Sequence, residues 1–201
     1  MSADAKDPVL HLLAGCNGAG KTTLYETVLG PITNLPFINA DVIAKEKWPG
    51  AEAEHSYQAA EIANSLRRAR ITKRSSFIAE TVFSHESKLQ LVEEAASAGF
   101  LITLHCVVIP ENLAVARVAN RVDNGGHFVP EGKIRQRYQR LWSLVAKAID
   151  DVHEAVLYDN SSARVPYKPV ARFQGGACIE ISVPLPSWLP AQLKDLIDNR
   201  F

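Results

Sequence analysis

The sequence predicts an α/β domain of three layers, in which a five-stranded, mainly parallel sheet carries helices on both faces and is followed by a C-terminal β-hairpin and helix. Short apolar runs alternate along the chain with segments of helical periodicity, which is typical of a parallel sheet. The length of 201 residues fits a single domain over residues 1–201. A hydrophobic fraction of 47% and a charged fraction of 22% exclude a chain that is disordered or fibrous throughout.

Three strands are expected in the first half of the chain. Val9–Leu13 is an apolar run that leads into a glycine-rich turn and a helix over about 21–28. Phe37–Ile38 is a second strand, which ends close to Asp41, and Phe77–Glu80 is a third. A parallel sheet brings the carboxyl ends of such strands to one edge.

Two longer helices accompany these strands. The first is expected over about 54–71, where apolar residues recur at intervals of three and four. Ser84 is a suitable N-cap for a second helix that runs to about Ala98, where Gly99 would end it.

The second half continues the alternation. Leu101–Ile109 is an apolar run that predicts a buried fourth strand, ends at Pro110 and is too short to cross a bilayer. Helices follow over about 111–122 and 131–149, and Ala155–Asp159 is a fifth strand.

The tail predicts a different kind of structure. Two apolar runs, Val170–Phe173 and Ala177–Val183, flank a Gln-Gly-Gly turn and indicate a hairpin added to the sheet edge. Leucines at helical spacing predict an amphipathic helix within 184–201. We expect residues from about 163 to 201 to form a structural extension of a core over about 8–162.

Residues 15–22 carry the strongest chemical signal. They read Gly-Cys-Asn-Gly-Ala-Gly-Lys-Thr and fit the phosphate-binding loop (P-loop) pattern G-x-x-x-x-G-K-[ST] without a mismatch, between a strand and a helix. Glycines let backbone N–H groups curl around phosphate oxygens. Lys21 is expected to reach the β- and γ-phosphates of ATP, and the Thr22 hydroxyl to bind Mg²⁺. The expected nucleotide-binding residues of the loop are Gly15, Asn17, Gly18, Ala19, Gly20, Lys21, Thr22 and Thr23.

Cys16 lies inside this loop. The N-terminus of the following helix is expected to lower the pKa of its thiol and to make it a target for alkylation or oxidation. For a physiological role, the favoured interpretation is a small residue that simply fits the loop. The three cysteines of the chain, Cys16, Cys106 and Cys178, show no pairing pattern and favour a reducing cytoplasm as the location.

Two carboxylates follow strands on the edge where the P-loop lies. Asp41 follows the second strand, where a kinase needs a carboxylate that accepts the proton of the attacking hydroxyl. The alternative is that Asp41 caps the helix over about 42–47. Glu80 and Thr81 end the third strand and are expected to bind the hydroxyls of the substrate, with support of Mg²⁺ as an alternative role for Glu80.

The remaining motifs favour a small kinase over other nucleotide-binding proteins. The fifth strand ends in Asp159-Asn160, which is expected to border the nucleotide base or to form a turn. The Asn-Lys-x-Asp of GTPases and the Leu-Ser-Gly-Gly of transporter ATPases do not occur. We therefore expect ATP as the phosphate donor and Asn160 among its binding residues.

Arginines on two neighbouring helices predict a phosphoryl-transfer lid over about 111–149. Arg117 and Arg121 are four apart and share one helical face. A second stripe consists of Lys133, Arg137 and Arg140, with Arg135 beside it. Arginine neutralises charge on the transferring phosphoryl group and closes the site against water. We expect Arg121 and at least one of Arg135, Arg137 and Arg140 to act in this way, and Arg117 and Arg137 to bind the nucleotide. The alternative is a solvated charged face.

Nucleic acid and membranes are not expected as partners. The chain has 22 Lys+Arg and 22 Asp+Glu, whereas proteins that bind polyanions through bulk charge are basic. A cationic run over 67–74 has no interleaved aromatic residues. We expect it to be a solvated helix end, where cations complement the helix dipole.

Taken together, these residues resemble the zeta-toxin family of small P-loop kinases, particularly its compact, solitary bacterial members. The resemblance covers about residues 8–162. The segments that carry it are Gly15–Thr23, Phe37–Asp41, Phe77–Thr81, Arg121 through Gly125-Gly126-His127-Phe128-Val129-Pro130 to Arg140, and Leu157–Ser161. Larger toxins have a second lid arginine just before the proline, where this chain has His127.

The resemblance implies an ATP- and Mg²⁺-dependent kinase that phosphorylates the 3′-hydroxyl of the N-acetylglucosamine unit of UDP-N-acetylglucosamine. It implies Asp41 as the general base and Arg121 as a clamp on the γ-phosphate. Lys21 and Thr22 would bind the phosphates and Mg²⁺, and Glu80 the sugar. It also implies a small helical antitoxin that obstructs the nucleotide site.

Three other functions fit the same residues. The first is a kinase for another small metabolite or for an antibiotic hydroxyl. The second is an ATP-hydrolysing or ATP-sensing switch that acts through protein contacts. The third is a polynucleotide kinase that uses the cationic run over 67–74.

Overall fold

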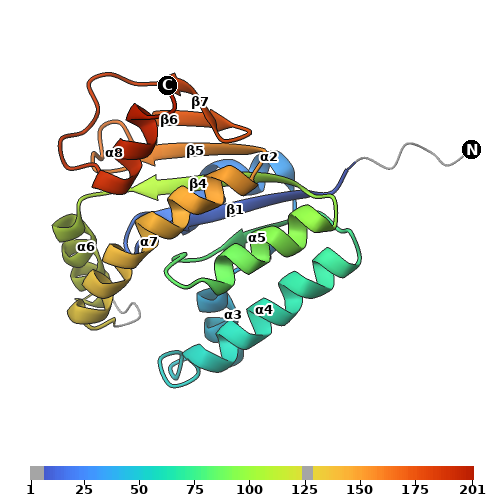
Figure 1. Cartoon of the computed structure of the whole chain (residues 1–201). Coiled ribbons are helices and arrows are strands. Elements are labelled where there is room, and N and C mark those ends of the chain that lie inside the picture. Colours follow the sequence, from blue (N-terminus) through green and yellow to red (C-terminus); the bar gives the residue numbers. More distant parts are fainter. Residues whose placement is uncertain (1–6, 124–128) are drawn as a thin grey trace, which may run out of the picture.

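The computed structural model describes residues 7–123 and 129–201 and contains one sheet of seven strands in the order β2-β3-β1-β4-β5-β6-β7 (Figure 1). The strands are β1 (Val9–Gly15), β2 (Phe37–Ile38), β3 (Phe77–Glu80), β4 (Leu101–Val108), β5 (Glu154–Asp159), β6 (Lys168–Gln174) and β7 (Ala177–Ile181). Strands β1 to β5 pair in parallel, whereas β5–β6 and β6–β7 pair antiparallel. The predicted α/β architecture is confirmed, and the sheet has seven strands rather than five because the predicted hairpin joins its edge.

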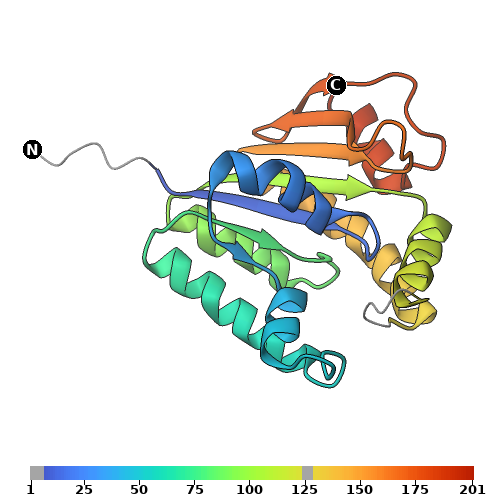
Figure 2. The same ribbon diagram turned by 180° about the vertical axis from the view of Figure 1, so that it is seen from behind.

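Helices cover both faces of the sheet. They are α1 (Lys21–Leu24), the π-helical η1 (Tyr25–Leu29), α2 (Gly30–Thr33), α3 (Ala40–Lys47), α4 (Ser56–Thr72), α5 (Ser87–Ser97), α6 (Glu111–Asp123), α7 (Glu131–Asp151) and α8 (Ala191–Asp198). Figure 1 shows α5, α7 and α8 in front of the sheet, and Figure 2 shows the segment α1–η1–α2 on the opposite face. Within the described part of the chain, no helix is both long and apolar enough to span a bilayer.

The first helix is longer than the sequence predicts. Helical backbone continues past Val28 through the π-helical turn to Thr33, and Asn34 ends it with a left-handed φ of 51°. Gly30 and Pro31 suggest a break, because proline has no N–H to donate to the preceding turn. Here the wider π-helical turn lies directly before them, and such turns interrupt the regular hydrogen-bond ladder without ending the helix.

Helix α5 begins later than predicted, so Ser84 is not its N-cap. The N-cap is Glu86, and His85 Nδ1 accepts a hydrogen bond from the Ser87 N–H at 3.2 Å. The C-terminal end agrees with the prediction, because Gly99 adopts a φ of +76° there.

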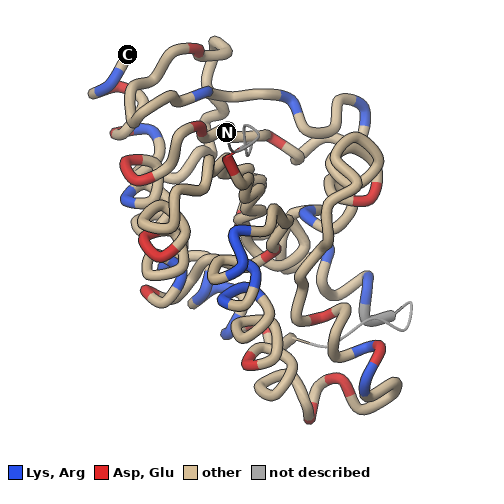
Figure 3. The backbone as a smooth tube through the Cα atoms, turned by 90° about the vertical axis from the view of Figure 1, so that its right-hand side faces the viewer, with Lys and Arg blue, Asp and Glu red and all other residues tan. Residues whose placement is uncertain are grey.

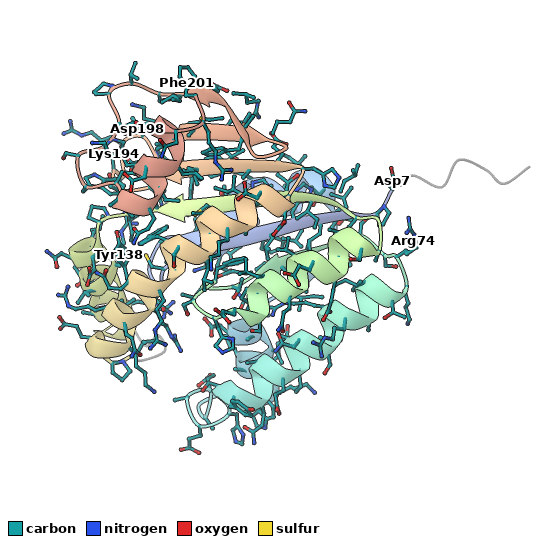
Figure 4. The ribbon with its side chains drawn as sticks, in the orientation of Figure 1. Asp7, Arg74, Tyr138, Lys194, Asp198 and Phe201 are labelled. Carbon is teal, nitrogen blue, oxygen red and sulfur yellow. The ribbon has the colours of Figure 1, made fainter. Side chains whose placement is uncertain are left out.

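The core lies on both faces of the central strands and holds the functional edge in place. Phe77 on β3 and Phe100 before β4 are buried and meet edge to face, with ring centroids 5.9 Å apart. On the helical layer, Tyr138 of α7 (labelled in Figure 4) donates its hydroxyl to the carbonyl of Ile109 at 2.9 Å. This bond ties α7 to the carboxyl end of β4.

Candidate active site

The P-loop follows β1 at the carboxyl edge of the parallel strands, on the side of α6 (Figure 1). Gly15 has a φ of +145°, and a Cβ there would lie 2.5 Å from the carbonyl oxygen of Val107. Gly20 is the N-cap of α1 with a φ of +96°. Both positions exclude side chains, so the glycines of the motif are required by the fold of the loop.

Lys21 is buried and lies folded over its own loop. Its Nζ donates to the carbonyl of Cys16 at 3.0 Å and lies 3.6 Å from Oε1 of Glu80. The side chains of Lys21 and Glu80 are only 6% and 10% exposed, so water screens this ion pair little. The P-loop and the end of β3 therefore form one charged site.

Glu80 joins three segments that are distant in the sequence. Its Oε2 accepts hydrogen bonds from Oγ1 of Thr22 at 2.8 Å and from Nδ2 of Asn39 at 2.7 Å. Of the two roles expected for Glu80, this position beside Thr22 and Lys21 favours support of the metal over contact with the sugar.

The oxygens of Thr22 and Glu80 fit Mg²⁺, which prefers hard hydroxyl, carboxylate and phosphate ligands. Within residues 7–123 and 129–201, no group of three His, Cys, Asp or Glu side chains could hold a metal ion. A magnesium ion at this site would thus be held by Thr22, Glu80 and the phosphates of ATP, as in other P-loop sites.

Asp41 lies in the first turn of α3, and its carboxylate is exposed. The N-cap of this helix is Asn39, whose Oδ1 accepts a hydrogen bond from the Asp41 N–H at 2.7 Å. The alternative that Asp41 is the cap is therefore wrong. Asn39 supplies that bond, and the Asp41 side chain remains available for chemistry.

Thr81 marks a turn directly after β3. Its N–H donates to the carbonyl of Leu13 on β1 at 3.0 Å, and its Oγ1 accepts from the N–H of Phe83 at 3.2 Å. Contact between Thr81 and a substrate stays a prediction.

Arg67 does not belong to a solvated helix end, as the sequence predicts for the run over 67–74. It is 3% exposed and donates to the carbonyl of Glu80 at 2.9 Å and to Oδ1 of Asn64 at 3.0 Å. Burial lowers the pKa of its guanidinium to about 10, against the opposing influence of the Glu80 charge. Arg67 therefore braces the end of β3.

The other basic residues at the C-terminal end of α4 are closer to the expectation (Figure 3). Arg68 is exposed and pairs with Glu94 at 3.2 Å, and Arg74 donates to the carbonyl of Ala98. Because Arg67 is buried, the cationic surface is smaller than the sequence suggests. This weakens the polynucleotide alternative.

The arginines expected in the lid differ in their contacts. Arg137 on α7 points at the P-loop, with its Nη1 3.5 Å from Oδ1 of Asn17. Arg135 instead pairs with Glu131 at 2.8 Å and Glu111 at 3.1 Å, and Arg121 is exposed on α6. The geometry therefore favours Arg137 among the arginines of the second stripe. The predicted loop residue His127 lies outside the described residues.

Arg117, Asn160 and Tyr167 contact the back of the P-loop. Arg117 Nη1 lies 3.5 Å from the carbonyl of Gly18, and its Nη2 donates to the carbonyl of Asn160 at 2.9 Å. Asn160 is buried, and its Nδ2 donates to the carbonyl of Ala19 at 2.8 Å. These contacts are with the loop backbone, whereas the sequence predicts Arg117 and Asn160 as direct nucleotide ligands.

Tyr167 is absent from the sequence prediction, because it lies in the extension, to which no chemistry is assigned. Its hydroxyl donates to the carbonyl of Gly20 at 2.8 Å, across 147 positions of sequence.

Of the two roles expected for Asp159, the structure shows the turn, since Asp159 Oδ1 accepts a hydrogen bond from the N–H of Ser161 at 2.7 Å.

The pKa of the Cys16 thiol is raised, whereas the sequence predicts that it is lowered. Cys16 is 1% exposed, and burial raises the pKa of its thiol to about 11 despite the neighbouring positive charge of Lys21. Desolvation outweighs the helix N-terminus here, so Cys16 is a small residue that fits the loop rather than a reactive thiol.

The sequence and the fold are similar to those of known proteins. The family model described as Zeta toxin matches residues 1–168. An uncharacterized protein of Haemophilus influenzae is 30% identical over 125 residues, which are 62% of this chain and 88% of that protein.

Two solved structures share the fold. A chain of the AvrRxo1-ORF1:AvrRxo1-ORF2 complex with ATP has a TM-score of 0.70 at 18% identity, over 96% of this chain and 64% of that chain. The PezAT chromosomal toxin-antitoxin system of Streptococcus pneumoniae has a TM-score of 0.60 at 14% identity, over 100% of this chain and 80% of that chain. This chain thus spans less than two thirds of the AvrRxo1 chain.

Proposed function

The chain belongs to the zeta toxin family, and we propose that it is an ATP-dependent kinase whose acceptor is a hydroxyl of a nucleotide-sugar, UDP-N-acetylglucosamine. One observation carries this proposal. Hydrogen bonds from Thr22 and Asn39 to Glu80 join the P-loop to the strand end that bears Asp41. Asp41 is two residues from Asn39 and exposed, where a hydroxyl acceptor would meet the γ-phosphate.

The proposed reaction assigns one task to each residue. Lys21 neutralises charge on the β- and γ-phosphates, and Arg121 and Arg137 neutralise the charge that spreads over the γ-phosphoryl group as it transfers. Asp41 accepts the proton of the acceptor hydroxyl while the new oxygen–phosphorus bond forms and the bond to ADP breaks. Mg²⁺, held by Thr22 and Glu80, would supply further neutralisation of the phosphates.

A protein partner is part of the proposal. The PezAT structure is that of a toxin-antitoxin system, and the AvrRxo1 structure contains ORF1 with ORF2. We propose that a small helical antitoxin covers the nucleotide site of this chain, and that the reaction takes place in the cytoplasm, where ATP is available.

Phosphorus NMR of the purified protein with ATP, Mg²⁺ and UDP-N-acetylglucosamine tests the proposal. A new sugar-phosphate monoester signal is expected, and it should vanish in Lys21→Ala but persist in Lys147→Ala, a matched change at an exposed lysine of α7. ADP and inorganic phosphate alone would overturn the proposed acceptor and favour another hydroxyl or a switch. Equal turnover by Lys21→Ala would overturn the P-loop role altogether.

A further inference from the structure

Three consecutive carbonyl groups of the P-loop each face a side chain from another part of the chain. The Gly18 carbonyl lies 3.5 Å from Arg117 Nη1, that of Ala19 accepts from Asn160 and that of Gly20 accepts from Tyr167, the last two at 2.8 Å. The donors come from α6, from the residue directly after β5 and from the residue directly before β6. The back of the loop is thus fixed at successive peptide units.

Fixing a carbonyl also fixes the next amide. A peptide unit is planar and trans, so the N–H of each residue points opposite to the preceding C=O. The bond from Asn160 to the Ala19 carbonyl therefore orients the N–H of Gly20. The bond from Tyr167 to the Gly20 carbonyl orients the N–H of Lys21, together with the helical bond from the Leu24 N–H to the same carbonyl at 3.0 Å. These are backbone donors of the kind that a P-loop offers to phosphate oxygens.

Asn160 is itself held firmly. It is 8% exposed, its N–H donates to the carbonyl of Val108 at 3.1 Å, and its carbonyl accepts from Arg117 at 2.9 Å. The backbone of Asn160 is thus anchored to β4 and α6, and its side chain connects the P-loop to both.

Tyr167 is held in a backbone conformation that an aromatic residue rarely adopts. Its φ is +53°, in the left-handed region that is unfavourable for side chains with a Cβ. Such conformations persist where the surrounding structure requires them, and they concentrate at functional sites. Burial raises the pKa of its hydroxyl, which keeps the group protonated and able to donate.

Gly20 completes the arrangement. A Cβ at this position would lie 2.5 Å from Asn160 Nδ2 and 3.1 Å from the Tyr167 hydroxyl. The glycine of the motif is thus required in this chain by the two side chains behind the loop, in addition to its positive φ.

We propose that Tyr167 and Asn160 are positioning residues for ATP, which hold the P-loop so that the N–H groups of Gly20 and Lys21 face the phosphates. The C-terminal extension is then part of the nucleotide site through Tyr167. This inference rests on the proposed use of ATP.

Calorimetric titration of ATP with Mg²⁺ into Tyr167→Phe tests it. This change removes only the hydroxyl, and we expect ATP to bind roughly two- to tenfold more weakly, the effect of one hydrogen bond. The KM for ATP should rise by the same factor, while the melting temperature without nucleotide should fall by only a few degrees, the effect of one hydrogen bond on the fold. Tyr57→Phe, at a tyrosine that is 74% exposed, is the matched control and should bind as before.

A second pair of variants separates positioning from folding. Tyr167→Gly relieves the left-handed backbone and should be more stable than Tyr167→Ala, yet both lack the hydroxyl and should lose the same affinity for ATP. Affinity that follows stability across this pair would overturn the inference, as would unchanged binding in Tyr167→Phe. If Lys21→Ala weakens binding while Tyr167→Phe does not, only the positioning role fails. If Lys21→Ala also binds normally, the proposed function fails with it.

Discussion

Asn39 accepts a hydrogen bond from the backbone N–H of Asp41 at 2.7 Å and at the same time donates to Glu80, also at 2.7 Å. One buried amide therefore caps α3 and ties the end of β2 to the end of β3. Because the cap is supplied by Asn39, the carboxylate two residues later is exposed in the first turn of α3. The Asp41 side chain is thus not used by the cap, which is consistent with its proposed role as the general base.

Replacement of Glu80 by glutamine should raise the Mg²⁺ requirement. Glutamine keeps an acceptor for Thr22 and Asn39 but removes the charge beside Lys21. The Mg²⁺ concentration for half-maximal turnover should rise by about tenfold or more, because Glu80 is proposed to hold the ion and loss of even an outer-shell group costs about that much. Glu46→Gln, at an exposed position of α3, is the control, and an identical Mg²⁺ titration for both variants would contradict the assignment.

Arg137 and Arg140 offer a paired test of the lid. They lie three residues apart on α7, but Arg137 approaches Asn17 of the P-loop whereas Arg140 is exposed. Arg137→Ala should lower kcat by about 10²-fold, the typical effect of removing one group that stabilises transferring charge. Arg140→Ala should leave steady-state kinetics nearly unchanged, so equal losses in the two variants would argue for general lid damage.

Cys16 should resist alkylation in the folded protein. Burial raises the pKa of its thiol to about 11, so at pH 8 it is both shielded and protonated. Mass spectrometry after iodoacetamide treatment should find Cys16 unmodified until urea unfolds the chain. The fully buried Cys106, whose pKa burial also raises, is the internal comparison. Rapid modification of Cys16 alone would restore the reactive thiol that the sequence predicts.

Acid should destabilise the fold through His11 and His105. Nδ1 of His11 lies 3.1 Å from Nε2 of His105, and burial lowers the pKa of both, that of His105 to about 3. The unfolded chain binds these protons below about pH 6.5, while the folded chain does not, so stability falls as pH drops from about 6.5 toward 3.

A variant that lacks the His105 imidazole isolates the contribution of this residue to the pH dependence of stability. For His105 alone, the free energy of unfolding should fall by about 2 kcal/mol between pH 7.5 and pH 5. Urea unfolding at both pH values should show this difference in the unaltered chain and a smaller one in His105→Leu. The same pH dependence in both proteins would place the acid sensitivity elsewhere.

The sheet and most helices could be predicted because their signals are local. Apolar periodicity and glycine or proline boundaries specified β4, α4 and α7 to within a few residues. The prediction that Ser84 caps α5 was wrong, because a residue suited to the N-cap does not by itself begin a helix. The π-helical turn before Gly30 had no local signature that distinguishes it from a helix end.

The site was predictable where chemistry follows a motif or a strand end. Lys21 lies in the P-loop and Glu80 ends a predicted strand, and the parallel sheet brings their charged groups to 3.6 Å from each other. The catalytic role of Asp41 stays a prediction. Tyr167 could not be found in this way, because its partner lies 147 residues earlier and nothing around it marks the contact. The burial of Arg67 could not be predicted either, because it lies in a run of charged residues that indicates a solvated surface.

The most direct test of the account is the rate of phosphoryl transfer in Asp41→Asn, measured in a single turnover with saturating ATP, Mg²⁺ and UDP-N-acetylglucosamine. We expect Asp41→Asn to lose roughly 10²- to 10⁴-fold in the rate of transfer with unchanged affinity for ATP, because only the proton acceptor is removed. Asp195→Asn, at an exposed position of α8, serves as the control. Transfer at the full rate in Asp41→Asn would contradict the assignment of Asp41 as the general base.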